Sequence, residues 1–170
     1  MVGSQTNPDM QRPSGRSNSV TERLTDLGLT LPQAVRPSHL FVPALTVDGL
    51  VTTSGQVPVK NGVLLAQGMV GLDVDLATAQ DCARQCVLNG LAAIREEAGD
   101  LERVAAVTKL LVFVATGPGF TEQSAVADAA SGLLLELFGD SAVHVRSAIG
   151  VVALPRQAPV EIELAATIRP

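Results

Sequence analysis

Arg146, Glu161 and Glu163 stand in the mostly apolar C-terminal stretch of the chain, where a buried strand would be expected to carry no full charge. Ala148 and Gly150 follow Arg146 at alternate positions. In a strand these small residues share a face with the arginine and leave a recess beside it. Because a guanidinium can hold a carboxylate through two parallel hydrogen bonds, the pattern favours a binding site for a small carboxylate at Arg146.

The two halves of this stretch, residues 145–152 and 160–168, alternate in hydrophobicity and predict the two strands of a hairpin with its turn at residues 154–158. We expect the apolar side chains to lie under helices and the charged side chains to lie on the opposite face of the sheet. In this hairpin Arg146 would lie about 10 to 17 Å along the sheet from Glu161. A structural ion pair between these two residues is the alternative to a ligand site.

Two histidines and two cysteines are the other residues that could bind a metal. His39 and His144 are far in sequence from Cys82 and Cys86, which stand four apart on one face of a predicted helix. A metal site needs further ligands, so we predict no metal and two reduced, buried cysteines. His144 would share a face with Arg146, where the role of a bystander is the simpler interpretation.

The chain divides into three segments. Residues 1–18 are polar and rich in Ser, Pro and Gly, which predicts a disordered tail. Residues 19–38 predict a short helix that ends at Gly28 and an extended, proline-containing connector. Residues 39–170 are long enough to bury a core and predict a single folded domain.

Within this domain the sequence predicts an order of elements that can be written βββ-α-β-α-ββ. Turns are expected at Asp48-Gly49 and Asn61-Gly62, a long helix between Asp75 and Gly99, a strand at residues 104–116 and a second helix that ends at Gly139. The C-terminal hairpin completes the order. We therefore predict an α+β fold in which two long helices lie on one face of a β-sheet.

The composition argues against several classes of protein. The net charge is −5, aromatic residues make up 2% of the chain, and Trp and Tyr do not occur. Grooves that bind nucleic acid need positive charge and aromatic side chains. No apolar run is long enough to cross a bilayer, and the N-terminus does not resemble a signal peptide. We therefore expect a cytoplasmic protein that binds neither nucleic acid nor membrane.

The strand at residues 104–116 is apolar on both faces except at Lys109. The predicted helices can cover only one of these faces. Because a large exposed apolar patch normally marks an interface, we expect the second face to be covered by self-association.

Two motifs in this sequence resemble those of a known family. The stretch RSAIGVVALPRQAPVEIELAA is similar to the C-terminal signature of the RidA family (also called YjgF or UK114), and TTSGQVP is similar to the signature of that family's second strand. The resemblance covers about residues 39 to 168 and indicates a divergent subgroup. It implies a chorismate-mutase-like fold with a mixed sheet, assembled as a homotrimer whose sheets form an inner barrel.

The resemblance also implies an activity and a set of site residues. Members of the family hydrolyse reactive enamines and imines, such as 2-aminoacrylate, to 2-keto acids and ammonia, without a cofactor. The carboxylate-binding arginine corresponds to Arg146, the glutamate that positions water to Glu161, and two further site positions to Ser54 and Gly55. A hydroxyl that bonds its own backbone is an equally good interpretation of Ser54, and Glu163 fits a neighbour without a catalytic role.

The chain departs from the best-known branch of the family at three site positions. Phe41 replaces a tyrosine, Ala148 replaces a frequent cysteine whose backbone amide is used, and Asp128 stands near a position where asparagine is usual. These differences leave the substrate open. A non-catalytic protein that binds or senses 2-keto acids is therefore the alternative to an imine deaminase, and an endoribonuclease is a less favoured third interpretation.

In the trimer that the resemblance implies, Arg146 of one chain would approach Ser54, Phe41 and Glu161 of its neighbour. We therefore expect each active site to be shared between two subunits.

Overall fold

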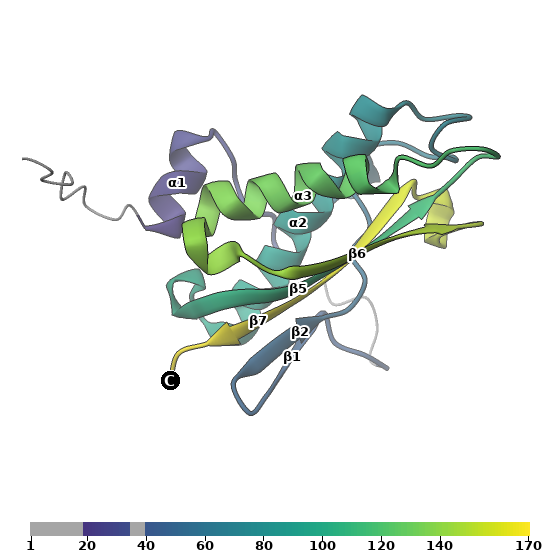
Figure 1. The fold of residues 1–170 in the computed structure, drawn as a ribbon. Helices are drawn as coiled ribbons and strands as arrows, with labels where there is room; N and C mark the ends of the chain where they lie inside the picture. Colours follow the sequence, from purple (N-terminus) through teal and green to yellow (C-terminus); the bar gives the residue numbers. More distant parts are fainter. Residues whose placement is uncertain (1–18, 35–39) are drawn as a thin grey trace, which may run out of the picture.

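The computed structural model describes residues 19–34 and 40–170, in which three helices lie on one face of a five-stranded sheet (Figure 1). The sheet has the strand order β1-β2-β7-β5-β6. Its strands are β1 (Ala44–Val47), β2 (Leu50–Thr53), β5 (Val104–Ala115), β6 (Val145–Val151) and β7 (Val160–Ile168). The short strands β3 (Val59–Lys60) and β4 (Val63–Leu64) pair separately. The predicted tail at residues 1–18 and part of the predicted connector, residues 35–39, lie outside the described residues.

The first two predicted turns have the backbone conformation that their sequences favour. Asp48 and Gly49 join β1 to β2 with φ of 50° and 77°, and Asn61 and Gly62 join β3 to β4 with φ of 52° and 83°. Two successive residues with positive φ give a tight hairpin connection, which Asn and Gly tolerate best.

Helix α2 (Leu76–Ala98) begins and ends where the sequence predicts. The Asp75 carboxylate accepts a hydrogen bond of 2.7 Å from the Thr78 amide and caps the helix, and Gly99, with φ of 85°, ends it. Cys82 and Cys86 are fully buried and unpaired. Burial raises the pKa of the Cys82 thiol to about 11 and also raises that of Cys86, so both behave as core residues.

Helices α3 (Gln123–Phe138) and α1 (Val20–Asp26) complete the helical layer. The Gln80 amide donates a hydrogen bond of 2.9 Å to the Ala125 carbonyl and links α2 to α3. Arg23 of α1 donates to the Leu137 carbonyl at 3.1 Å and links α1 to the end of α3. The two long helices therefore form one surface that covers the sheet.

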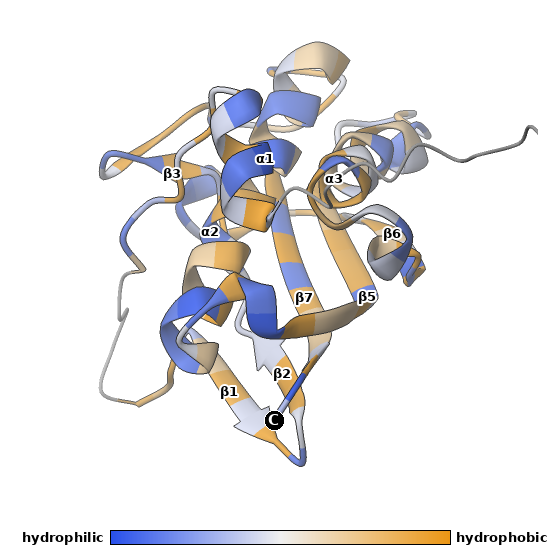
Figure 2. Ribbon diagram, turned by 90° about the vertical axis from the view of Figure 1, so that its left-hand side faces the viewer, coloured by the Kyte–Doolittle hydropathy of each residue, from blue (hydrophilic) through white to orange (hydrophobic). Residues whose placement is uncertain are grey.

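The sheet alternates in polarity where it meets the helices, as Figure 2 shows along β7. The residues of β7 that face the helices are buried: Val160, Ile162, Leu164 and Ala166. Glu161 and Glu163 point to the opposite face, which we call the open face. Strand β5 is apolar for most of its length, in agreement with its central position between β7 and β6.

The predicted C-terminal hairpin is wrong. Strand β5 lies between β6 and β7, pairing parallel with β6 and antiparallel with β7. The connection at residues 152–159 crosses the end of β5, where the Thr116 amide donates to the Val151 carbonyl and the Ala115 amide to the Pro159 carbonyl. Alternation along two strands does not show whether they are neighbours in the sheet, so a connection that crosses β5 resembles the turn of a hairpin in the sequence.

In the described part of the chain, no helix combines the length and the apolar character needed to cross a membrane.

Candidate functional site

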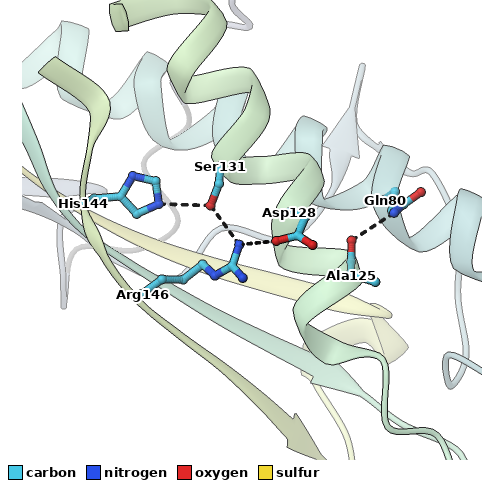
Figure 3. A network of polar contacts seen from close by, with 6 residues as sticks. All are labelled: Gln80, Ala125, Asp128, Ser131, His144 and Arg146. Carbon is cyan, nitrogen blue, oxygen red and sulfur yellow. Dashed lines mark hydrogen bonds and ion pairs between the residues drawn. The ribbon is translucent and has the colours of Figure 1, made fainter. Parts of the chain in front are cut away.

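Arg146 lies on β6, the edge strand of the sheet, and its side chain reaches helix α3 (Figure 3). The Nη1 atom donates to Oδ1 of Asp128 at 2.8 Å and to Oγ of Ser131 at 3.1 Å. The Arg146 side chain is 25% exposed, whereas that of Asp128 is 67% exposed. The guanidinium is therefore anchored from one side and still accessible from solvent.

The face predicted for Arg146 is wrong. Arg146 pairs with Leu110, which is fully buried, and Ala148 pairs with Val112 and packs against the core. Both side chains therefore lie on the helix side of the sheet. On the other face of this edge strand Val145 and Ile149 are exposed, at 69% and 43%, although they are apolar. The apolar residues of β6 therefore do not mark its buried face.

Ser54, Gly55 and Glu161 form a second group, where the chain leaves β2 beside β7, the central strand of the sheet. Thr52 pairs with Ala165 while Gln56 pairs with Ile162, so the chain leaving β2 has one residue more than β7 over this interval. The extra residue forms a β-bulge between Thr52 and Gln56, and bulges redirect the neighbouring side chains.

Gly55 permits the carboxylate of Glu161 to lie against the backbone. A Cβ atom at Gly55 would stand 1.8 Å from Oε1 of Glu161, so a larger residue would displace that carboxylate. Burial raises the pKa of Glu161, and the charge of Glu163 raises it further. A glutamate with a raised pKa in a partly enclosed position is suited to accept a proton.

Ser54 is held by the segment that precedes β1. Its Oγ donates to the Val42 carbonyl at 2.6 Å, and its amide donates to the Pro43 carbonyl at 2.8 Å. Because the single hydroxyl hydrogen is used, Ser54 offers a ligand only its lone pairs in this arrangement. Phe41, next to Val42 in sequence, is 51% exposed and presents an apolar ring to solvent.

A single chain does not bring Arg146 and Glu161 together. Glu161 is level with Phe113 and hence with Ile149, three residues along β6 from Arg146. Three residues and two strand spacings place the two Cα atoms about 14 Å apart. Their side chains also leave opposite faces of the sheet, because Arg146 contacts α3 and Glu161 lies on the open face.

A cavity of about 220 Å³ lies at the end of the sheet where residues 152–158 cross over. Gly68, Met69, Asp73 and Gln157 contribute to its lining. None of the predicted site residues lines this cavity, so it lies apart from the candidate site formed by Arg146 and Glu161. The described residues contain no group of three or more His, Cys, Asp or Glu side chains placed to hold a metal.

Sequence reasoning missed Ser131 and did not give His144 a role. His144 Nε2 lies 3.0 Å from Ser131 Oγ, which in turn accepts from Arg146. Asp128 and Ser131 are three residues apart and therefore share a face of α3. That spacing was a readable signal, but only the placement of β6 beside α3 shows which residue the face meets.

The fold belongs to the chorismate-mutase-like α+β class, with helices on one face of a mixed sheet and the other face open. Residues 21–166 match the family model described as "YjgF/chorismate_mutase-like, putative endoribonuclease", and the chain belongs to this family. The family predicted from the two sequence motifs is thereby confirmed.

Three known proteins illustrate the range of relatives. Protein TCP17 of Trypanosoma cruzi is 38% identical over 148 residues, which cover 86% of this chain and 92% of TCP17. The crystal structure of Atu1372 from Agrobacterium tumefaciens, a protein of unknown function, is 39% identical with a TM-score of 0.83, covering 88% of this chain and 92% of that one. E. coli TdcF with bound serine is 26% identical with a TM-score of 0.56, covering 81% and 93%.

Proposed function

We propose that this protein hydrolyses small 2-imino or 2-enamino carboxylates to 2-keto acids and ammonia. The observation that carries the proposal is the state of Arg146. Its Nη1 atom is bonded to Asp128 and Ser131, while Nε and Nη2 have no hydrogen-bond partner among the described residues. The Nε and Nη2 hydrogens form a fork that matches the two oxygens of a carboxylate.

We further propose that the complete site lies between subunits of a homotrimer. Because Arg146 and Glu161 lie on opposite faces of the sheet, each chain carries two separate parts of a site, one with Arg146 and one with Glu161. A neighbouring chain would bring Glu161, Gly55, Ser54 and Phe41 to the carboxylate held by Arg146. The open face and the edge strand also carry exposed apolar side chains, including Val145 at 69% and Ile149 at 43%, whose burial would favour association.

The reaction requires an oriented substrate and the transfer of two protons to nitrogen, one after the other. With the carboxylate on Arg146, the imine carbon is electrophilic and can be attacked by a water that donates a proton to Glu161. Glu161 passes that proton to the imine nitrogen as the C=N double bond becomes single, which gives a carbinolamine. Glu161 then takes the proton of the carbinolamine hydroxyl and delivers it to the nitrogen, so the C=O double bond forms, the C–N bond breaks, and ammonia and the 2-keto acid are released. Arg146 positions the substrate, and the raised pKa of Glu161 suits both directions of proton transfer.

An endoribonuclease is less well supported. The family description names this activity, but a chain with net charge −5, 2% aromatic residues and no Trp or Tyr lacks the usual means of holding RNA.

A protein that only binds 2-keto acids would use the same Arg146. The proximity of Glu161 to Gly55 favours catalysis, because carboxylate binding alone does not need a partly buried anion. The related E. coli TdcF holds bound serine in its crystal structure. Serine is a small amino acid with a carboxylate, which fits a site of the kind proposed for Arg146.

The test is release of ammonia and keto acid from freshly generated 2-aminoacrylate. We expect the wild-type protein to accelerate release above the uncatalysed rate and Arg146→Ala to lose the acceleration. Arg84→Ala is the matched control, because Arg84 also pairs with a carboxylate, that of Glu136, but on the outer surface of the helices. Wild-type release no faster than the buffer rate would contradict the deaminase and leave the binding protein.

A further inference from the structure

Three side chains form a continuous hydrogen-bonded series beside the proposed site: His144, Ser131 and Arg146 (Figure 3). His144 Nδ1 is bonded to the Ala142 carbonyl, and His144 Nε2 lies 3.0 Å from Ser131 Oγ. Ser131 Oγ lies 3.1 Å from Arg146 Nη1. The series joins the segment before β6 to helix α3 and returns to β6.

The direction of each hydrogen bond in this series follows from chemistry. A carbonyl oxygen can only accept, so the Ala142 carbonyl requires the proton of the neutral imidazole on Nδ1 of His144. Nε2 then carries a lone pair and accepts the hydroxyl hydrogen of Ser131. With its hydrogen committed to His144, Ser131 presents a lone pair to Arg146, whose Nη1 can only donate. Ser131 must accept from Arg146 in any case, and the bond to His144 fixes the direction of the hydroxyl hydrogen and therefore the direction of the lone pair that faces the arginine.

Asp128 by itself would hold Arg146 loosely. Its side chain is 67% exposed, and an exposed ion pair contributes little and leaves the guanidinium free to rotate about a single contact. Ser131 and His144 are both partly buried and are supported by helix α3 and the Ala142 backbone. Two acceptors on the two hydrogens of Nη1 define the plane of the guanidinium, which a single acceptor does not.

We infer that Ser131 and His144 are positioning residues that fix the guanidinium plane of Arg146 and direct its Nε and Nη2 hydrogens toward the substrate carboxylate. This inference rests on the proposed function of Arg146. It assigns to His144 a role through Ser131 and not through contact with substrate. Ser131 and His144 would therefore affect carboxylate affinity in concert, and the chemical step only slightly.

The experiment uses the full-length protein and measures pyruvate binding by calorimetry, together with KM and kcat for the hydrolysis of 2-aminoacrylate. We expect Ser131→Ala and His144→Phe each to weaken pyruvate binding and raise KM by up to about tenfold, the loss of one well-placed hydrogen bond, with a smaller change in kcat. Ser131→Thr, which keeps the hydroxyl, should bind nearly as well as wild type. The double variant should bind no more weakly than Ser131→Ala alone, because His144 acts only through Ser131.

Ser124→Ala, an exposed serine to alanine change on the same helix, is the matched control. Pyruvate affinity and KM unchanged in both Ser131→Ala and His144→Phe, with affinity lost in Arg146→Ala, would overturn the positioning role and leave the proposed function intact. Additive losses in the double variant would also overturn it. Affinity unchanged in Arg146→Ala would remove the proposed function and the positioning role together. If Ser131→Ala does not fold, the comparison of His144→Phe with His144→Gln, which keeps an acceptor, decides between the same outcomes.

Discussion

Arg146 donates from one nitrogen to two side chains of α3, and this division of its donors determines what the residue can still bind. The sequence indicated an anion-binding arginine from its small neighbours Ala148 and Gly150. It did not indicate Ser131, because the partner of an edge-strand residue depends on which helix crosses beside it. Residue types were therefore predictable at this site, whereas the contacts that orient them were not.

Arg146→Lys should fail to restore carboxylate binding. A lysine ammonium has three donors at one point and cannot satisfy Asp128, Ser131 and both oxygens of a ligand carboxylate. We expect pyruvate affinity to fall by about tenfold or more, toward the level of Arg146→Ala, as measured by calorimetry. Arg84→Lys is the matched control, and wild-type affinity in Arg146→Lys would show that only positive charge is needed.

Glu161→Gln should stabilise the protein near neutral pH. The pKa of Glu161 is raised in the folded state, so its ionisation opposes folding once the pH exceeds the ordinary range of a glutamate. The stability that the protonated carboxyl contributes is fully present below the unfolded-state pKa and is lost as the pH rises through the folded-state pKa. Thermal unfolding should show a higher midpoint for Glu161→Gln at pH 7 and no difference near pH 4.

Exposed Glu122 supplies the control for this comparison, as Glu122→Gln. A midpoint for Glu161→Gln equal to or below that of wild type at pH 7 would contradict the environment described for Glu161.

At the scale of the elements, local signals and long-range order differ in how well sequence predicts them. Asp75 and Gly99 mark the ends of α2 because caps depend on a few neighbouring residues. The position of β6 in the sheet, by contrast, does not depend on residues that are near it in sequence. Strand β6 is placed by helix α3, which connects the parallel strands β5 and β6. The alternation of residue types along β6 and β7 does not show that β5 lies between them.

Gly55, in the bulge between Thr52 and Gln56, lies against the Glu161 carboxylate, so Gly55→Ala should impair catalysis more than stability. The added Cβ would meet the flexible end of the Glu161 side chain, which can swing away at little cost to folding. We expect kcat for the hydrolysis of 2-aminoacrylate to fall by about a hundredfold, the lower end of what a general base contributes, with pyruvate affinity nearly unchanged. Gly132→Ala, at a glycine where the added Cβ would meet no atom within 4 Å, is the control for the glycine change itself. Unchanged kcat in Gly55→Ala would show that the position of the Glu161 carboxylate is not used.

At the scale of the whole molecule, Arg146 and Glu161 lie on opposite sides of the sheet. The helices cover the side on which Arg146 is anchored, and Glu161 lies on the side that they leave uncovered. Sequence indicated that this face needs a partner, because β5 is apolar on both sides. The same separation makes each chain an incomplete site under the proposed function.

The most direct test of a site shared between subunits mixes two inactive variants. Arg146→Ala and Glu161→Ala proteins are dissociated, combined and reassembled, and ammonia release from 2-aminoacrylate is measured against each variant reassembled alone. Random mixing in equal amounts should restore up to about a quarter of wild-type activity, because each site draws an intact Arg146 and an intact Glu161 with a chance of about one half each. No recovery at any ratio, with subunit exchange verified, would contradict a site built from Arg146 of one chain and Glu161 of its neighbour.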